Sequence, residues 1–155
     1  RSMNQFQALL WLCSDETAEK DLDNRIAGLM LFTSSERVLL VRRSAHENRA
    51  GQWELPGGHV KKGESDVDAA LREAGEELGG VPKDIEVIDV SRQLPSNESK
   101  VYYTTVIAKT TTTRWRPQLN EEHDHWGWFG QDDLPRGIHP GVIETLSSFT
   151  EKEAA

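Results

Sequence analysis

Apolar and polar residues alternate in short blocks along the chain, and most apolar blocks have the length of strands. Residues 26–33 and 37–43 are β-favouring and are separated by a short polar segment, which predicts a hairpin. Residues 85–93 and 100–110 show the period-two pattern of half-buried strands, and the polar stretch 95–99 predicts the turn that joins them.

One segment in the middle of the chain has the pattern of an amphipathic helix, with predicted bounds of about 66–78. Ser65 and Asp68 resemble a capping box at its start, and Gly79 is suited to the left-handed conformation in which helices commonly end. At 100° per residue one arc of this helix is apolar and should pack on a sheet. The residues of this arc are Val67, Ala70, Leu71, Ala74 and Leu78.

The remaining blocks complete an α/β pattern. The glycine-rich stretch 44–63 predicts a long loop interrupted by WELPGG at 53–58. Residues 126–129 predict a short aromatic strand, and 141–152 a closing amphipathic helix with Pro140 at its first position. Strands on both sides of a central helix predict a mixed sheet packed between helices. The apolar stretch 5–13 fits a strand or a short helix, and it could be core or the interface of a homodimer.

Length and composition narrow the class of protein. A chain of 155 residues fits one domain, 1–155, in which Arg1 and Ser2 ahead of Met3 are interpreted as a cloning remnant. The net charge of −8 argues against binding to long nucleic acid, and the apolar runs are too short to span a membrane. The single Cys13 and the lack of a signal-peptide pattern favour a cytoplasmic location.

The central helix carries an unusual cluster of like charges. Glu73, Glu76 and Glu77 are spaced i, i+3 and i+4, where side chains are neighbours and carboxylates repel each other. Arg72 is the nearest cation and can pair with one of them without neutralising all three. A solvated acidic face is the plain interpretation. A glycine-rich turn that ends in Glu64 precedes the helix, and oxygen ligands at this density suit Mg²⁺ or Mn²⁺.

Residues 58–80 read GHVKKGESDVDAALREAGEELGG, which resembles the Nudix box. The fixed positions that match in spacing are Gly58, Glu64, Arg72, Glu73, Glu76, Glu77 and Gly79. One departure is Gly80, where the motif has an aliphatic residue. The stretches VLLVRR at 38–43, WELPGG at 53–58 and WGWF at 126–129 are similar to segments of MutT-type members, so the likeness covers roughly residues 26–150.

The resemblance implies an α/β/α sandwich with a divalent metal site. In such a site Glu73, Glu76 and Glu77 hold Mg²⁺, or Mn²⁺, together with a backbone carbonyl of the pair Gly57–Gly58. Glu64 acts in the outer shell or on a second metal. Arg72 orients Glu73 by a charge-assisted hydrogen bond, for which a planar guanidinium is better suited than lysine.

The implied reaction is attack of water on a phosphorus of a diphosphate. The base that takes the proton is either Glu73 or a residue of the later segment NEEHDHW, with Glu122 favoured and Glu121 and His123 behind it. The alternative for this segment is an exposed polar loop.

Two further contacts with substrate are expected. Gly58 lets the substrate approach the backbone, and Arg43 holds a terminal phosphate, since its distance in sequence to the glycine pair resembles that in MutT-type enzymes. Four of the tryptophans are candidates for base stacking, although aromatic residues are more often core. These are Trp53, Trp115, Trp126 and Trp128.

The favoured substrate is a nucleoside triphosphate cleaved to monophosphate and pyrophosphate. Nucleotide sugars, dinucleotides and the 5′-triphosphate end of RNA are alternatives in the same class of hydrolase. An isomerase on the same scaffold and a non-catalytic nucleotide sensor are alternatives from other classes. A sensor would ordinarily have lost some of the box carboxylates, and this sequence keeps them all.

Overall fold

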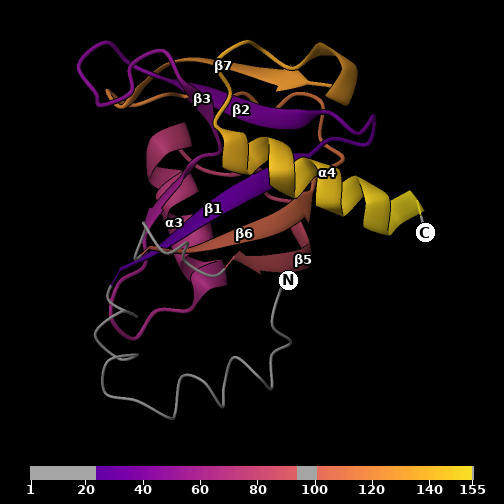
Figure 1. Cartoon of the computed structure of the whole chain (residues 1–155), viewed down its shortest axis with the longest axis horizontal. Helices are drawn as coiled ribbons and strands as arrows, with labels where there is room; N and C mark the ends of the chain where they lie inside the picture. Colours follow the sequence, from indigo (N-terminus) through magenta and orange to yellow (C-terminus); the bar gives the residue numbers. More distant parts are fainter. Residues whose placement is uncertain (1–23, 94–100, 155) are drawn as a thin grey trace.

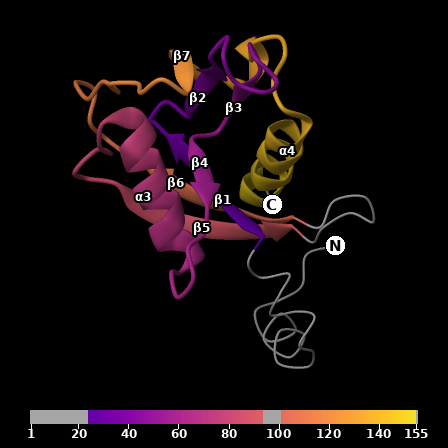
Figure 2. The ribbon, with the colours of Figure 1, turned by 90° about the vertical axis from the view of Figure 1, so that its left-hand side faces the viewer.

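The computed structural model describes residues 24–93 and 101–154 and shows a mixed β-sheet between two helices (Figure 1). Helix α3 (Asp66–Leu78) covers one face of the sheet, and helix α4 (Pro140–Ala154) covers the other (Figure 2). The predicted α/β/α sandwich is therefore confirmed. The apolar stretch 5–13 and the turn predicted at 95–99 lie outside the described residues.

Strand β1 (Arg25–Phe32) is the centre of the sheet. Along one edge it pairs in parallel with β6 (Tyr102–Lys109), which pairs antiparallel with β5 (Glu86–Gln93). Its other edge is shared between two strands. The short strand β4 (Gly57–His59) pairs with the start of β1, and β2 (Val38–Arg43) pairs with its end.

The predicted hairpin is present only at its tip, because β1 and β2 form a single pair, Phe32 with Val38, before they diverge. Strand β2 then pairs with β3 (Trp53–Glu54) on one side and with β7 (His123–Phe129) on the other. A 3₁₀ turn, η1 (Gln131–Asp133), follows β7.

The prediction of a long loop at 44–63 is wrong where it omits strands, since β3 and β4 both lie within it. The divergence of β1 and β2 leaves backbone N–H and C=O groups unpaired on both strands, and these short segments pair with them. The sheet is thereby split beside β1, and β4 leads directly into the turn before α3.

Helix α3 has the predicted bounds, 66–78. The Ser65 hydroxyl accepts a hydrogen bond from the Asp68 N–H, and Gly79 adopts a left-handed conformation with φ of 69° at the C-terminal end. Three residues of the predicted apolar arc, Ala70, Ala74 and Leu78, are buried, while Val67 and Leu71 are partly buried against the same core.

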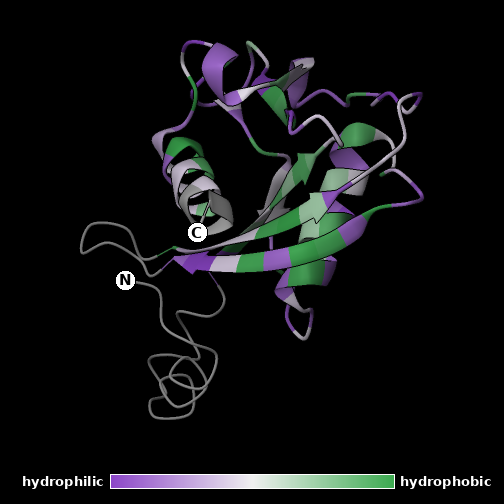
Figure 3. Cartoon of the chain, turned by 90° about the vertical axis from the view of Figure 1, so that its right-hand side faces the viewer, coloured by the Kyte–Doolittle hydropathy of each residue, from purple (hydrophilic) through white to green (hydrophobic). Residues whose placement is uncertain are grey.

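The core forms two clusters, one on each side of the sheet. The α3 side includes Leu29, Leu31 and Val106, and the α4 side includes Met30 and Val142. Figure 3 shows apolar residues concentrated in the strands and in the helix faces that meet them, with hydrophilic residues in the connecting loops. Within the part of the chain that is described, neither helix combines the length and the apolar character that crossing a bilayer requires.

Candidate active site

The last turn of α3 brings a glutamate into the interior of the protein. Glu77 is 3% exposed, and its carboxyl oxygen Oε2 accepts a hydrogen bond of 2.8 Å from the Gly57 N–H of β4. Only glycine fits at that position of β4, because a Cβ on Gly57 would lie 2.3 Å from the Ala27 carbonyl oxygen of β1. The close pairing of β4 with β1 therefore sets the position of the Glu77 carboxyl group.

The next residue of β4 accommodates a second glutamate. A Cβ on Gly58 would lie 2.5 Å from Oε2 of Glu73, so the Glu73 carboxylate occupies the space that a side chain at Gly58 would need. The glycine pair of the box thus lies directly against two carboxylates of α3. Glycine at position 57 therefore permits the approach to β1, and glycine at position 58 leaves space for the Glu73 carboxylate.

Arg72 gathers the other acidic residues of the box. Its Nε and Nη2 donate to the two carboxylate oxygens of Glu64 at 2.8 and 3.1 Å, and its Nη1 donates to Glu73 at 2.9 Å and to Glu76 at 3.2 Å. Nη2 also donates to the His59 carbonyl oxygen. Hydrogen bonds from Arg72 lower the pKa of Glu64 to about 2, and the carboxylates raise the pKa of Arg72.

Arg72 contacts Glu73 and also Glu76, and it has no contact with Glu77 among the described bonds, so it does not neutralise all three glutamates of the helix. Glu77 has a different neighbour, the exposed Glu122 of the segment before β7. Burial raises the pKa of Glu77 to about 10, helped by a hydrogen bond with the Glu122 carboxyl group and only partly opposed by the Gly57 N–H. The Glu77 carboxyl group therefore keeps its proton at neutral pH unless a cation replaces it.

The segment that carries Glu122 is fixed to the C-terminal end of α3. The Gln118 N–H donates to the Leu78 carbonyl oxygen at 2.8 Å, and the Asn120 N–H donates to that of Glu77 at 3.3 Å. The Asn120 side chain accepts from the Glu122 N–H at 3.0 Å. These bonds use the free carbonyl groups at the helix end to place Glu122 beside Glu77.

Ser44, just after β2, holds the same segment from the other side. Its hydroxyl donates to the Glu121 carbonyl oxygen at 2.7 Å, and its N–H donates to that of Glu122 at 2.9 Å. Glu121 itself is exposed. The segment is therefore not a free polar loop, although its acidic side chains reach solvent.

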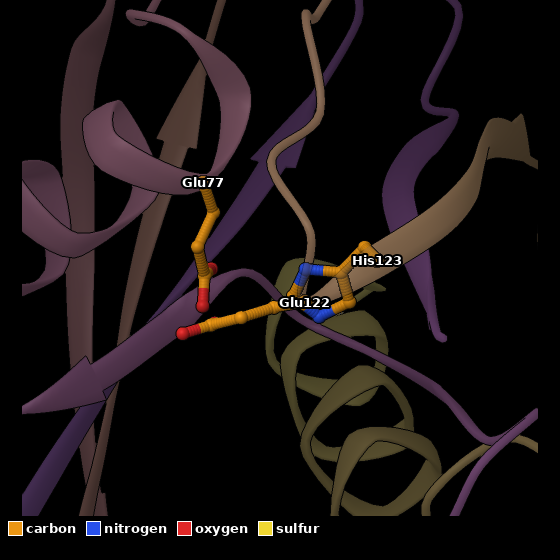
Figure 4. A group of neighbouring side chains, drawn as sticks. All are labelled: Glu77, Glu122 and His123. Atoms are coloured by element: carbon orange, nitrogen blue, oxygen red, sulfur yellow. The ribbon is translucent and has the colours of Figure 1, made fainter. Parts of the chain in front are cut away.

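His123, the first residue of β7, lies next to this carboxyl pair with a fully buried side chain. Its Nε2 is 2.9 Å from Oε2 of Glu54 in β3. One ligand atom from each of Glu77, Glu122 and His123 lies within 4.8 Å of the others (Figure 4). Among the described residues this is the group of acidic and histidine side chains whose spacing suits a metal ion.

Arg43 contacts several acceptors of its own loop. Its Nη1 lies 3.1 Å and 3.3 Å from the two carboxylate oxygens of Glu54, its Nη2 lies 3.5 Å from Glu47, and its Nε donates to the Asn48 carbonyl oxygen at 2.6 Å. Arg43 therefore fixes Glu54. A phosphate bound by Arg43 would have to replace at least one of these partners, and its predicted role as a phosphate ligand stays a prediction.

The expected metal-binding residues fall into two sets. Glu77 joins Glu122 and His123, whereas Glu73 and Glu76 contact Arg72. The donors fit Mg²⁺ or Mn²⁺ on chemical grounds, because a buried carboxyl group beside a second carboxyl group is a natural ligand for a hard cation. The individual roles of these residues, and of Gly57 and Gly58, stay predictions.

Sequence reasoning missed Glu54, Asn120 and Ser44. Glu54 lies in the WELPGG stretch and Asn120 directly precedes the pair Glu121–Glu122, so both lie near predicted site residues in the sequence. Neither carries a signal of its own, because their roles depend on contacts across the sheet. The four candidate tryptophans all pack against the two core clusters, which favours the interpretation as core.

Comparisons with known proteins agree on one family. A family model described as NUDIX domain matches residues 23–149. The chain is 34% identical over 100 residues to a nucleoside triphosphate pyrophosphatase/Nudix hydrolase fusion protein of Bifidobacterium longum, which covers 63% of this chain but 20% of that protein. It is 30% identical to the asymmetrical bis(5′-nucleosyl)-tetraphosphatase of Mus musculus, over 70% of this chain and 80% of that one.

Solved structures lead to the same family. A Nudix hydrolase from M. smegmatis, RenU, superposes with a TM-score of 0.70 at 26% identity, covering 85% of this chain and 86% of its own. This agreement extends over both helices and the sheet between them.

Proposed function

The chain belongs to the Nudix family, and from this premise we propose that it is a Mg²⁺-dependent pyrophosphohydrolase acting on nucleoside diphosphate derivatives. The favoured substrate is a nucleoside triphosphate, cleaved to monophosphate and pyrophosphate. The single observation that carries the proposal is the buried Glu77 carboxyl group, which meets Glu122 beside the glycine pair of β4.

This observation favours a metal site of an enzyme over the alternative that the glutamates only form a solvated acidic surface. An acidic face that served only solubility would leave its carboxylates in water, whereas ionising the buried Glu77 would place a negative charge in the interior beside a second carboxyl group. Such an arrangement is costly unless a cation binds there, so its presence supports a metal site. The complete set of box carboxylates supports a hydrolase over a sensor that has lost them.

A divalent cation held at this place would neutralise the phosphate oxygens and lower the pKa of the attacking water. Arg72 fixes the orientation of Glu73 against Gly58 through a bond of 2.9 Å, so that this carboxylate faces the substrate side of the glycine pair. Because the arginine also holds Glu64 and Glu76, the outer carboxylates keep their positions when substrate arrives.

We assign Glu122 as the group that takes the proton from water. Glu122 is exposed, while its backbone is fixed by Asn120 and Ser44, so its carboxylate can reach solvent without losing its position. Glu73 is the second candidate, because it lies against the glycine pair. In either case the proton moves from water to a carboxylate oxygen as the water oxygen bonds to phosphorus, and the bridging P–O bond breaks to release pyrophosphate.

The choice of substrate rests on the similarity to MutT-type members and on relatives whose names describe nucleotide derivatives, among them a tetraphosphatase and RNA pyrophosphohydrolases of Legionella pneumophila. Nucleotide sugars, dinucleotides and RNA 5′ ends are the alternative substrates. We further propose a cytoplasmic location, which the single cysteine supports.

The test is a panel of these four substrate classes with Mg²⁺, in which products are identified by ion-exchange chromatography. The double variant Glu76→Gln/Glu77→Gln should lose several orders of magnitude in rate on the best substrate. The reason is that the variant would no longer hold the cation that stabilises negative charge in the transition state. Gly75→Ala, on the same helix with open space around it, is the matched control. Equal rates for the double variant and the parent would refute the metal site.

A further inference from the structure

His123 is an unusual residue for the interior of this protein. Its side chain is 0% exposed, yet imidazole has two polar nitrogens that both need partners when buried. One of them has a partner in Glu54, at 2.9 Å from Nε2. The other, Nδ1, is buried and has no hydrogen-bond partner among the described residues.

The contact with Glu54 determines which nitrogen carries the proton. The Glu54 oxygens also accept two contacts from the Arg43 guanidinium, at 3.1 and 3.3 Å, and both of these contacts come from a donor-only group. With Glu54 as the acceptor, Nε2 of His123 is the donor of the 2.9 Å contact. In the neutral ring the lone pair then lies on Nδ1.

The imidazole that carries this unpartnered nitrogen lies at the acidic pair described above. Figure 4 shows the imidazole beside Glu122 with a ring nitrogen turned toward the Glu77 carboxyl group. The ligand atoms of the three residues lie within 4.8 Å of one another, which is the spacing of groups around one small cation. A buried lone pair and two carboxyl groups therefore converge on the same space.

We propose that His123 Nδ1 is a nitrogen ligand of a divalent cation that Glu77 also binds, and that Glu54 orients the imidazole from behind. Glu122, in the same group of side chains, stays free to take the proton from water. A histidine ligand that donates its second N–H to a carboxylate is the common arrangement at metal sites, because the carboxylate fixes the ring and strengthens the ligand. This inference rests on the proposed function and deepens it. It adds a residue that lies outside the Nudix box motif.

A mixed nitrogen and oxygen site changes the choice of metal. Mg²⁺ prefers oxygen ligands in regular octahedral geometry, whereas imidazole suits transition metals such as Fe²⁺, Ni²⁺ and Zn²⁺. Mn²⁺ also favours oxygen ligands, but as a transition metal it accepts a nitrogen ligand more readily than Mg²⁺ does. The position that includes His123 should therefore bind Mn²⁺ more tightly than Mg²⁺. A second cation at Glu73 and Glu76, where only oxygens are available, should not show this preference.

The direct test is pulsed electron paramagnetic resonance on the full chain loaded with one equivalent of Mn²⁺, which detects a nitrogen bound to the metal. The parent should show nitrogen modulation, and growth with ¹⁵N-histidine should change it to the ¹⁵N pattern. His123→Gln should abolish the modulation, because a glutamine can still donate to Glu54 near the place of Nε2 but has no atom at Nδ1. His125→Gln, at an exposed histidine of the same strand, is the control and should keep it.

Calorimetric titration with Mn²⁺ supplies the affinity. His123→Gln should weaken Mn²⁺ binding by about tenfold or more while Mg²⁺ binding changes less, and Glu54→Gln should weaken Mn²⁺ binding by about 10- to 100-fold while the nitrogen modulation remains. Urea unfolding of the metal-free variants shows whether each variant is folded. If a variant is not folded, the spectra of the parent protein still test whether a nitrogen is bound to the metal.

The inference is overturned if the parent shows no nitrogen modulation, or if the modulation persists in His123→Gln. The result that would refute this inference differs from the result that would refute the proposed function. A parent that cleaves diphosphates without a nitrogen signal refutes only the role of His123. A parent with the signal that cleaves no member of the panel supports the ligand and refutes the hydrolase.

Discussion

Replacing Glu77 with glutamine tests whether its carboxyl group carries a proton in the metal-free protein. Burial first, and then the neighbouring Glu122, raise the pKa of Glu77 from 4.5 to about 10 in the folded protein. In the unfolded chain the group ionises near its ordinary value. Between these two values the folded state therefore holds one proton more than the unfolded state.

The sign of the effect on stability follows from this difference. A raised pKa in the folded state gives stability that is complete below about pH 4.5 and is lost as the pH rises toward 10. One proton corresponds to about 1.4 kcal/mol per pH unit, so the contribution of Glu77 falls by about 2.7 kcal/mol between pH 6 and 8. Glu77→Gln keeps an oxygen that accepts the Gly57 N–H and has no proton to lose.

The assay is urea unfolding in the presence of EDTA at pH 6, 7 and 8. The parent should lose stability relative to Glu77→Gln by about 1.4 kcal/mol per pH unit, because titration of all other groups cancels in the comparison. Glu76→Gln removes an exposed carboxylate of the same helix and should follow the parent. Parallel pH profiles of the parent and Glu77→Gln would refute the protonated, buried state of Glu77.

Other predictions concern the groups around this carboxyl. Gly58→Ala should lower kcat/KM by about a hundredfold, because its methyl group would displace the Glu73 carboxylate, while the urea midpoint changes little. Gly75→Ala should raise the free energy of unfolding by about 0.5–1 kcal/mol and leave turnover unchanged, because this helical position is open. Arg72→Lys should lower both the urea midpoint and kcat, because lysine lacks the fork that holds three glutamates. Asn120→Ala should lower kcat about tenfold at similar KM, and Asn120→Asp, which keeps the acceptor oxygen, should restore most of it.

The helix and its acidic residues could be predicted from sequence because their signals are local. Ser65 and Gly79 fix the two ends of α3 through contacts within a few residues, and the structure has the same bounds. The box carboxylates lie on that helix or in the turn before it. These carboxylates come close to the glycine pair once β4 lies beside α3.

The rest of the site depends on pairing between distant segments. Glu54 and His123 are 69 residues apart and meet because β2 pairs with β3 on one side and with β7 on the other. No local pattern specifies that arrangement. The split between β1 and β2 was hidden for the same reason, since both strands have the composition expected of a simple hairpin.

The burial of Glu77 could not be read from the helical pattern either. The pattern places Glu73, Glu76 and Glu77 on one polar arc, but the described contacts put Glu76 at the surface and Glu77 in the interior. The difference arises because the segment around Asn120 covers only one side of the helix end.

The most direct test of metal-dependent diphosphate cleavage at this site is a ³¹P NMR time course of a nucleoside triphosphate with the parent protein and Mg²⁺. Monophosphate and pyrophosphate should appear together in equal amounts, and neither should form once EDTA is added. Release of inorganic phosphate with nucleoside diphosphate, or cleavage that continues in EDTA, would contradict the account.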